Sequence, residues 1–149
     1  MSIAERRSDT VWTGPLATGK GTVTGRSGAL GELPVTWASR TERPDGKTSP
    51  EELAAAAHSS CFSMALALTL GQHGAEPERL QVGATVTLDA VDGVPTIVSS
   101  AISVDATVPG LTADDFSAIL DEAAKLCPVS RLFAGATITV ESTFTPTAS

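Results

Sequence analysis

A long stretch without permanently charged side chains, residues 53–70, constrains the fold of this chain most strongly. A helix that is apolar on nearly all sides is either a core helix or a membrane span. The stretch barely reaches spanning length, and His58, several serines and four consecutive alanines dilute it. We therefore expect a central core helix that other elements surround, with no association of the chain with a membrane.

The residues before this stretch carry helix-start signals. Ser49 suits the N-cap, Pro50 suits the first helical position, and Glu52 completes a capping-box pattern. Glu51 and Glu52 lie where the helix dipole favours negative charge. The helix is expected to end near Gly71 or Gly74, because glycine is the usual residue just beyond a helix.

The rest of the chain is predicted to form strands, one further helix and a short helix after it. Glycine-rich turns divide residues 10–38 into short strands, a pattern typical of an antiparallel meander, and residues 40–48 form a polar loop. Strict alternation over residues 80–90 predicts a strand with one buried face, and a second strand follows over residues 94–108.

A helix is expected to open at Thr112, with one apolar stripe of four residues: Phe116, Ile119, Leu120 and Ala123. Cys127-Pro128 breaks it and starts a short helix, and residues 138–144 alternate in a last strand. The predicted fold class is α+β, an antiparallel sheet packed on helices, as a single domain over residues 1–149.

Charge and cysteine content limit the function. The net charge of −7 and the pI near 4.7 argue against nucleic acid and acidic membrane surfaces as partners. The first residues contain no apolar segment of the signal-peptide kind, so we expect a cytoplasmic protein, in which a structural disulfide is uncommon. The two cysteines then indicate redox chemistry, metal binding or simple core filling.

Local cues rank Cys127 above Cys61 as a nucleophile. Cys127 can occupy an N-cap, where backbone N–H groups lower the pKa of a thiol, and Arg131 follows four residues later. Burial in the apolar helix should raise the pKa of Cys61 unless a cation approaches it. His58, three residues before Cys61, could activate the thiol, although such a histidine is more often a hydrogen-bonded core residue.

Metal binding is disfavoured. His58, Cys61, His73 and Cys127 are possible zinc ligands, but the chain has no C-x-x-C or H-x₃₋₅-H pair, and we expect no metal or cofactor. Without further information, Glu51 is an ordinary first-turn acid and the arginines of the polar loop are solvated charges.

Two motifs resemble the OsmC/Ohr family of thiol-dependent peroxidases. The first comprises TSPEEL at residues 48–53, AAAH at residues 55–58 and CFSMAL at residues 61–66, with Ser59 and Ser60 in place of the family's usual small apolar pair. The second is AKLCPVS at residues 124–130, and Trp12, Gly14, Gly19 and Gly21 echo the family's opening pattern. The Cys-Pro-Val-Ser form is similar to the osmotically induced (OsmC) branch. The resemblance covers nearly the whole chain.

The resemblance implies an intertwined α+β homodimer with long central helices. It implies that Cys61 is the peroxidatic thiol and Cys127 the resolving thiol, which reverses the ranking from local cues. It also implies a catalytic pair in which Glu51 orients an arginine. Arg40 matches the family position of that arginine, while Arg43 and Arg26 remain alternatives.

The implied activity is reduction of organic hydroperoxides, and of hydrogen peroxide less well, in oxidative and osmotic stress defence. A Cys61 sulfenic acid and a Cys61–Cys127 disulfide would be the intermediates, and the family points to an external dithiol of lipoyl type as the reductant. A different class is also open: a non-catalytic, stress-induced ligand-binding or scaffold protein with vestigial thiols.

Helix geometry adds a prediction about assembly. Glu51 and Cys61 are ten positions apart, about 15 Å along a continuous helix, which is too far for a glutamate side chain to bridge. Either the helix starts later, or Glu51 acts on the cysteine of a second chain. The capping signals favour the second reading, an obligate homodimer whose sites combine Cys61 and Cys127 of one chain with Glu51 and Arg40 of the other.

Overall fold

Two sheets organise the chain, one in each of two compact units. The computed structural model describes residues 1–146; the first unit runs from Met1 to Leu53 and the second begins at Ala54. Each unit contains a three-stranded sheet, which agrees with the predicted α+β class. The prediction of a single domain over residues 1–149 stays a prediction.

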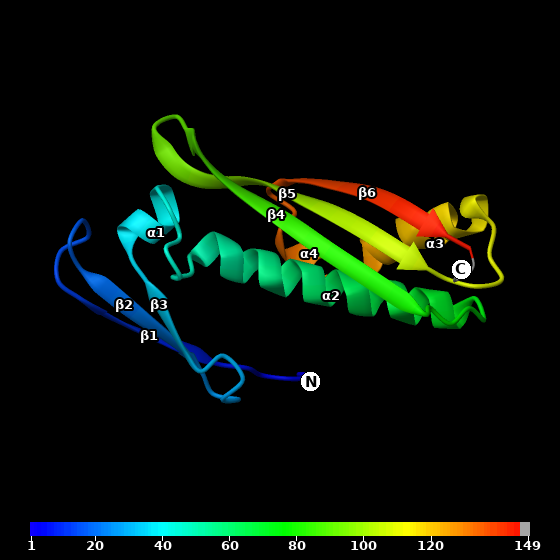
Figure 1. Cartoon of the computed structure of the whole chain (residues 1–149), viewed down its shortest axis with the longest axis horizontal. Coiled ribbons are helices and arrows are strands. Elements are labelled where there is room, and N and C mark those ends of the chain that lie inside the picture. Colours follow the sequence, from blue (N-terminus) through cyan, green and yellow to red (C-terminus); the bar gives the residue numbers. More distant parts are fainter. Residues whose placement is uncertain (147–149) are drawn as a thin grey trace. The chain divides into compact units, whose positions relative to one another are not determined.

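The first unit is the predicted meander followed by a short helix. Its antiparallel strands β1 (Ser8–Thr13), β2 (Lys20–Gly25) and β3 (Glu32–Val35) lie in sequence order (Figure 1). The β1–β2 turn requires glycine at position 19, because a Cβ there would lie 2.5 Å from the carbonyl oxygens of Thr13 and Pro15.

Helix α1 (Trp37–Thr41) occupies the start of the region that we predicted as a polar loop. Thr36 caps it: the Thr36 side chain accepts a hydrogen bond from the Ser39 N–H at 3.0 Å, and the Ser39 hydroxyl accepts one from the Thr36 N–H at 3.0 Å. This reciprocal capping box explains why a five-residue helix forms here. The sequence reading missed it because Ser39, rather than a Glu or Gln, is the fourth residue of the capping-box pattern.

Helix α2 (Pro50–Gln72) confirms the predicted long helix and its start. The Ser49 hydroxyl accepts a hydrogen bond from the Glu52 N–H at 3.1 Å, as expected of an N-cap. At the other end, Gly74 has φ of +73° and the Ala75 N–H donates to the Leu70 carbonyl at 2.9 Å. Gly74, not Gly71, is therefore the terminating glycine.

The second unit holds the sheet β4 (Arg79–Val91), β5 (Val94–Thr107) and β6 (Thr137–Thr145), in that order. A tight turn with positive φ at Asp92 and Gly93 joins the antiparallel pair β4 and β5. The strand β6 runs parallel to β5, which corrects the prediction of a wholly antiparallel sheet. The reason is the connection: α3 (Ala113–Leu126) and α4 (Pro128–Leu132) carry the chain back before β6 begins.

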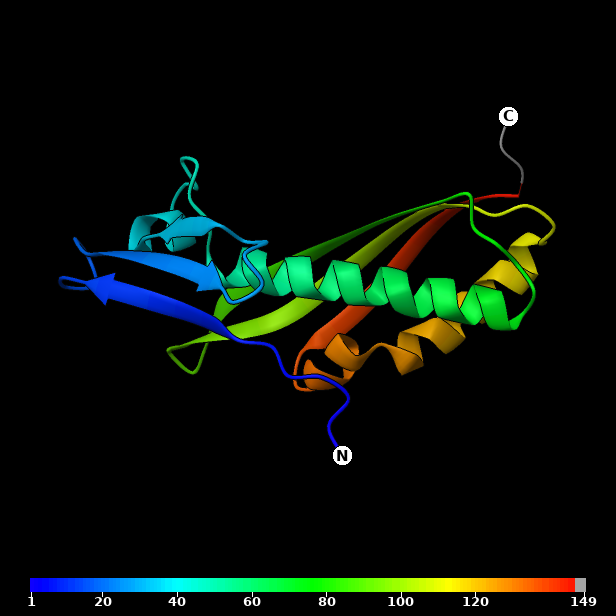
Figure 2. The same ribbon diagram turned by 90° about the horizontal axis from the view of Figure 1, so that it is seen from below.

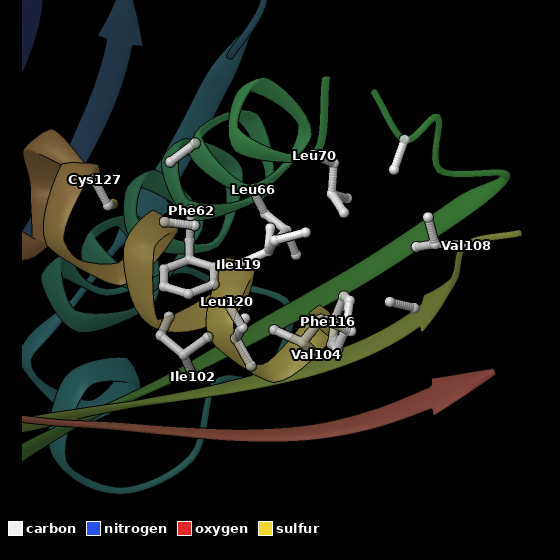
Figure 3. Close-up of a cluster of buried hydrophobic side chains, with 14 residues drawn as sticks. Phe62, Leu66, Leu70, Ile102, Val104, Val108, Phe116, Ile119, Leu120 and Cys127 are labelled. Atoms are coloured by element: carbon white, nitrogen blue, oxygen red, sulfur yellow. The ribbon is translucent and has the colours of Figure 1, made fainter. Parts of the chain in front are cut away.

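Helices α2 and α3 pack on one face of this sheet (Figures 1 and 2). The core between them is continuous, and Cys127 lies at one end of it (Figure 3). All four residues of the predicted α3 stripe are buried, which confirms that amphipathic reading. Fully buried side chains of the core include Phe62, Leu66, Leu70, Ala106, Val108 and Ala123.

One face of α2 remains uncovered, contrary to the expectation that other elements surround this helix. Phe62 and Leu66 are fully buried, whereas Met64 is 74% and Leu68 58% exposed. In the described part of the chain, α2 is also the one helix long and apolar enough to cross a membrane by length and composition alone. Its packing in the core accounts for one apolar face, and Met64 and Leu68 lie on the face that remains exposed.

Candidate active site

The two cysteines meet in the second unit. Cys61 lies in the middle of α2 and is half-buried, whereas Cys127 lies between α3 and α4 and is fully buried. Both are free thiols, and their side chains lie close enough together for Cys127 to affect the ionisation of Cys61. Because disulfide formation requires thiols in contact, this pair can close a disulfide once either sulfur is oxidised.

The surroundings of Cys61 act on its ionisation in opposite directions. Burial raises the pKa of the Cys61 thiol, the Val129 backbone N–H hydrogen bond lowers it, and the hydrogen bond with Cys127 raises it again. Burial is the largest of these effects, so the pKa lies above its ordinary value. This agrees with the expectation that Cys61 needs a cation to become a thiolate near neutral pH.

The short helix α4 begins at Cys127, and its N-terminus affects the pKa of Cys61. Cys127 is its N-cap, as predicted, but among the described residues its side chain makes no capping hydrogen bond. Pro128, at the first helical position, has no N–H group. The next N–H group, that of Val129, lowers the pKa of the Cys61 thiol. The ranking of Cys127 above Cys61 from local cues stays a prediction.

His58 is a fully buried, fully hydrogen-bonded histidine. Its Nδ1 lies 2.6 Å from the Ser100 hydroxyl on β5, and its Nε2 lies 2.7 Å from the Ser130 hydroxyl on α4. Burial lowers the pKa of His58, so the ring is neutral, with one nitrogen donating and the other accepting. The Phe133 ring packs edge-on against it at 5.3 Å. The structure thus confirms the interpretation as a hydrogen-bonded core histidine.

These hydrogen bonds also bear on metal binding. With both ring nitrogens of His58 engaged by hydroxyl groups, neither is open to a cation. Within residues 1–146, no three His, Cys, Asp or Glu side chains gather closely enough to hold a metal ion.

Arg40 and Glu51 form a bidentate ion pair in the first unit. The Arg40 Nη2 lies 2.7 Å and its Nε 2.9 Å from Glu51 Oε1, with Oε2 at 3.2 Å from Nε. Arg40 also stacks over the Trp37 ring at 5.9 Å, and Glu51 is nearly buried. The planar guanidinium is therefore fixed in one orientation by two neighbours.

The alternative arginines have other surroundings. Arg43 is exposed in the loop after α1, and Arg26 pairs with Asp9 at 3.0 Å on the meander. Of the three arginines that the sequence offered, Arg40 is the one that contacts Glu51.

An apolar hollow of about 380 Å³ adjoins Arg40 within the first unit. The side chains that line it with Arg40 are mainly apolar: Trp12, Leu16, Val35, Trp37 and Pro50, with Thr10 and Thr36. Neither α1 nor this hollow was apparent in the sequence, although the two tryptophans and the apolar residues between them were visible there.

An α+β fold with two contacting cysteine thiols, one of them in a long core helix, defines a thiol-based redox protein. Comparison with known proteins narrows the class. The family described as OsmC-like protein matches residues 43–143, and the chain belongs to that family.

Two relatives make the assignment concrete. The chain is 43% identical over 121 residues to peroxiredoxin OsmC of Escherichia coli strain K12, covering 81% of this chain and 84% of that protein. The Shigella flexneri protein of the same name matches equally well. The protein is accordingly a thiol-dependent peroxidase of the antioxidant stress-response kind.

Solved structures share the fold. The organic hydroperoxide resistance protein OhrB of Bacillus subtilis superposes with a TM-score of 0.70 at 20% identity, covering 92% of this chain and 98% of that one. An OsmC-like protein of unknown function from Vibrio cholerae gives 0.77 at 14% identity, covering 95% and 100%. At these identities the likeness concerns the fold.

Proposed function

We propose that the protein reduces organic hydroperoxides, and hydrogen peroxide less well, with Cys61 as the peroxidatic and Cys127 as the resolving thiol. The observation that carries the proposal is the pair of neighbouring free thiols at the end of the α2–α3 core. Cys61 is the half-buried member and Cys127 the fully buried one, so a substrate reaches Cys61 first.

The chemistry follows in three balanced steps. The Cys61 thiolate attacks the terminal peroxide oxygen, the O–O bond breaks, and the leaving alkoxide takes a proton to become an alcohol. Cys127 then attacks the sulfenic acid sulfur, forming the disulfide and releasing water. An external dithiol, of lipoyl type in this proposal, restores both thiols and becomes a disulfide itself.

In this proposal Arg40 supplies the positive charge that the raised pKa of Cys61 calls for, and Glu51 holds its guanidinium in place. The bidentate geometry of the pair supports the orienting role of Glu51. An arginine guanidinium is positively charged at every physiological pH, so it can stabilise a thiolate at any of them.

We assign the Arg40–Glu51 pair to the Cys61 of a second chain. The helix α2 runs without a break from Pro50, so Glu51 and Cys61 are about 15 Å apart along its axis. The exposed α2 face, with Met64 and Leu68, offers an apolar surface along which a second copy packs. An obligate homodimer follows as part of the proposal.

The preference for organic peroxides is supported by the apolar hollow beside Arg40, which suits an alkyl or aryl group better than water. The cytoplasm is the proposed location, because a reducing compartment keeps both thiols free between cycles.

Single-cysteine variants test the proposal. Cys61→Ser should abolish peroxide consumption, since no other thiol is placed to attack. Cys127→Ser should consume about one equivalent and stop at a trappable sulfenic acid. If Cys127→Ser loses the first step while Cys61→Ser retains it, the two roles are reversed.

A further inference from the structure

Two links join α4 to α2 side by side. In the first, Cys61 packs beside Cys127 and Val129, both of which affect its ionisation. In the second, His58 Nε2 lies 2.7 Å from the Ser130 hydroxyl. His58 and Cys61 are three residues apart on α2, as are Cys127 and Ser130 across the start of α4, so each helix presents the two links on one face.

The helix α4 has few other attachments: Val129 packs against the core, and Phe133, its C-cap, packs edge-on against the His58 ring. The helix is only five residues long, none of its residues is buried, and a helix of this length does not hold its conformation alone. The break at Cys127-Pro128 leaves it joined to α3 without a continuous helical hydrogen-bond ladder. Its position therefore depends on what its side chains and N-terminus contact in the rest of the unit.

Oxidation of Cys61 disrupts the first link. The sulfenic acid carries an added oxygen at the sulfur that accepted the Val129 N–H and contacted Cys127. Cys127 must then approach that sulfur from the side opposite its S–O bond. During this step the Ser130–His58 hydrogen bond keeps α4, and Cys127 with it, beside α2, together with the contact of Phe133 on the same ring and the packing of Val129.

We propose that His58 is a positioning residue for disulfide formation: through Ser130 it holds α4 so that Cys127 stays within reach of the oxidised Cys61. The inference rests on the proposed function, because it concerns the second step of that cycle. In that step the S–O bond of the sulfenic acid breaks, the S–S bond forms, and the Cys127 proton leaves with the hydroxyl group as water.

The opposite side of the imidazole supplies a matched control. Ser100 on β5 lies 2.6 Å from Nδ1 and is fully buried, whereas Ser130 is half-buried. Ser100→Ala and Ser130→Ala each remove one hydroxyl group that is hydrogen-bonded to the His58 ring, but only Ser130→Ala removes the hydrogen bond to α4. Loss of the fully buried Ser100 hydroxyl should lower stability more, because the nitrogen it leaves has no access to water.

The experiment counts free thiols against time after rapid mixing with excess cumene hydroperoxide, followed by an acid quench. Loss of the first thiol reports oxidation of Cys61, and loss of the second reports the disulfide. For Ser130→Ala we expect the second phase to slow about three- to tenfold, the equivalent of one hydrogen bond, with the first phase changed less than about twofold. Ser100→Ala should lower the urea midpoint more and slow the second phase less.

Conservative variants separate positioning from stability. Ser130→Thr keeps the hydroxyl group and should restore the second phase. His58→Gln places an amide group about where Nε2 lies, and His58→Asn places one only as far as Nδ1. The rate of the second phase should therefore be closer to that of the unmodified protein in His58→Gln than in His58→Asn. Slow resolution should also make Ser130→Ala accumulate Cys61 sulfinic acid at high peroxide, detectable by mass spectrometry.

Two results would overturn the inference. One is a second phase in Ser130→Ala as fast as in the unmodified protein; the other is equal slowing in Ser100→Ala and Ser130→Ala. If the unmodified protein loses no thiol in either phase, the proposed peroxidase cycle itself fails, and the positioning role fails with it.

Discussion

The ion pair between Arg40 and Glu51 should respond unequally to the loss of its two members. The Glu51 side chain is 11% exposed and that of Arg40 30% exposed. Arg40→Ala leaves a nearly buried carboxylate without its partner, whereas Glu51→Ala leaves a guanidinium that reaches water and still stacks on Trp37. Removing one member of a fully buried pair costs about 3–5 kcal/mol, and an exposed pair contributes about 0–1 kcal/mol.

For this intermediate case we expect a loss of about 2 kcal/mol in the free energy of unfolding for Arg40→Ala. The α2 N-terminus stabilises Glu51 and keeps the loss below the buried-pair value. For Glu51→Ala we expect about 1 kcal/mol. At a urea m-value of about 2 kcal/mol/M, the midpoints should fall by about 1 M and about 0.5 M respectively.

Urea unfolding at one fixed protein concentration measures both variants, with the exposed Arg43→Ala as a control expected to stay within about 0.5 kcal/mol. A Glu51→Ala variant as unstable as Arg40→Ala refutes the reasoning.

Three further outcomes follow from the site. Alkylation rates against pH should show a higher Cys61 pKa in Arg40→Ala and little change in Arg43→Ala; a shift in the second variant alone would reassign the role. Cys61→Ser and Glu51→Ala should each be nearly inactive, and their refolded heterodimers should regain one working site; heterodimers as inactive as their parents place the site within one chain. Burial lowers the pKa of His58 in the folded state below its unfolded value of about 6.5. Between the folded and the unfolded pKa the unfolded state binds more protons, so the free energy of unfolding should fall as the pH drops below about 6.5. Urea midpoints from pH 7.5 to 5 should therefore fall less steeply in His58→Gln, and equal slopes would contradict the assignment.

The sequence predicted the elements whose signals are local. The α2 cap at Ser49, the apolar stripe of α3 and the alternation of β4 each depend on neighbouring residues, and the structure confirms all three. It did not predict the parallel pairing of β6 with β5, because strand direction depends on the path of the whole connection.

In the candidate site, too, the features set by neighbouring residues were predicted and those set by distant parts of the chain were not. Spacing alone placed His58 and Cys61 on one face of α2, but the partners of His58 come from β5 and α4, far away in the sequence. A helix N-terminus was correctly located at Cys127, but its Val129 N–H acts on the pKa of Cys61, which belongs to another element.

The central claim, that the two contacting thiols form a peroxide-reducing pair, is tested most directly by counting free thiols before and after one equivalent of cumene hydroperoxide. The protein has two cysteines, both free. The account predicts that both thiols disappear and that a dithiol such as dihydrolipoamide restores them, with one alcohol released per chain. Two thiols remaining after the peroxide is added would contradict the account and favour a binding or scaffold protein.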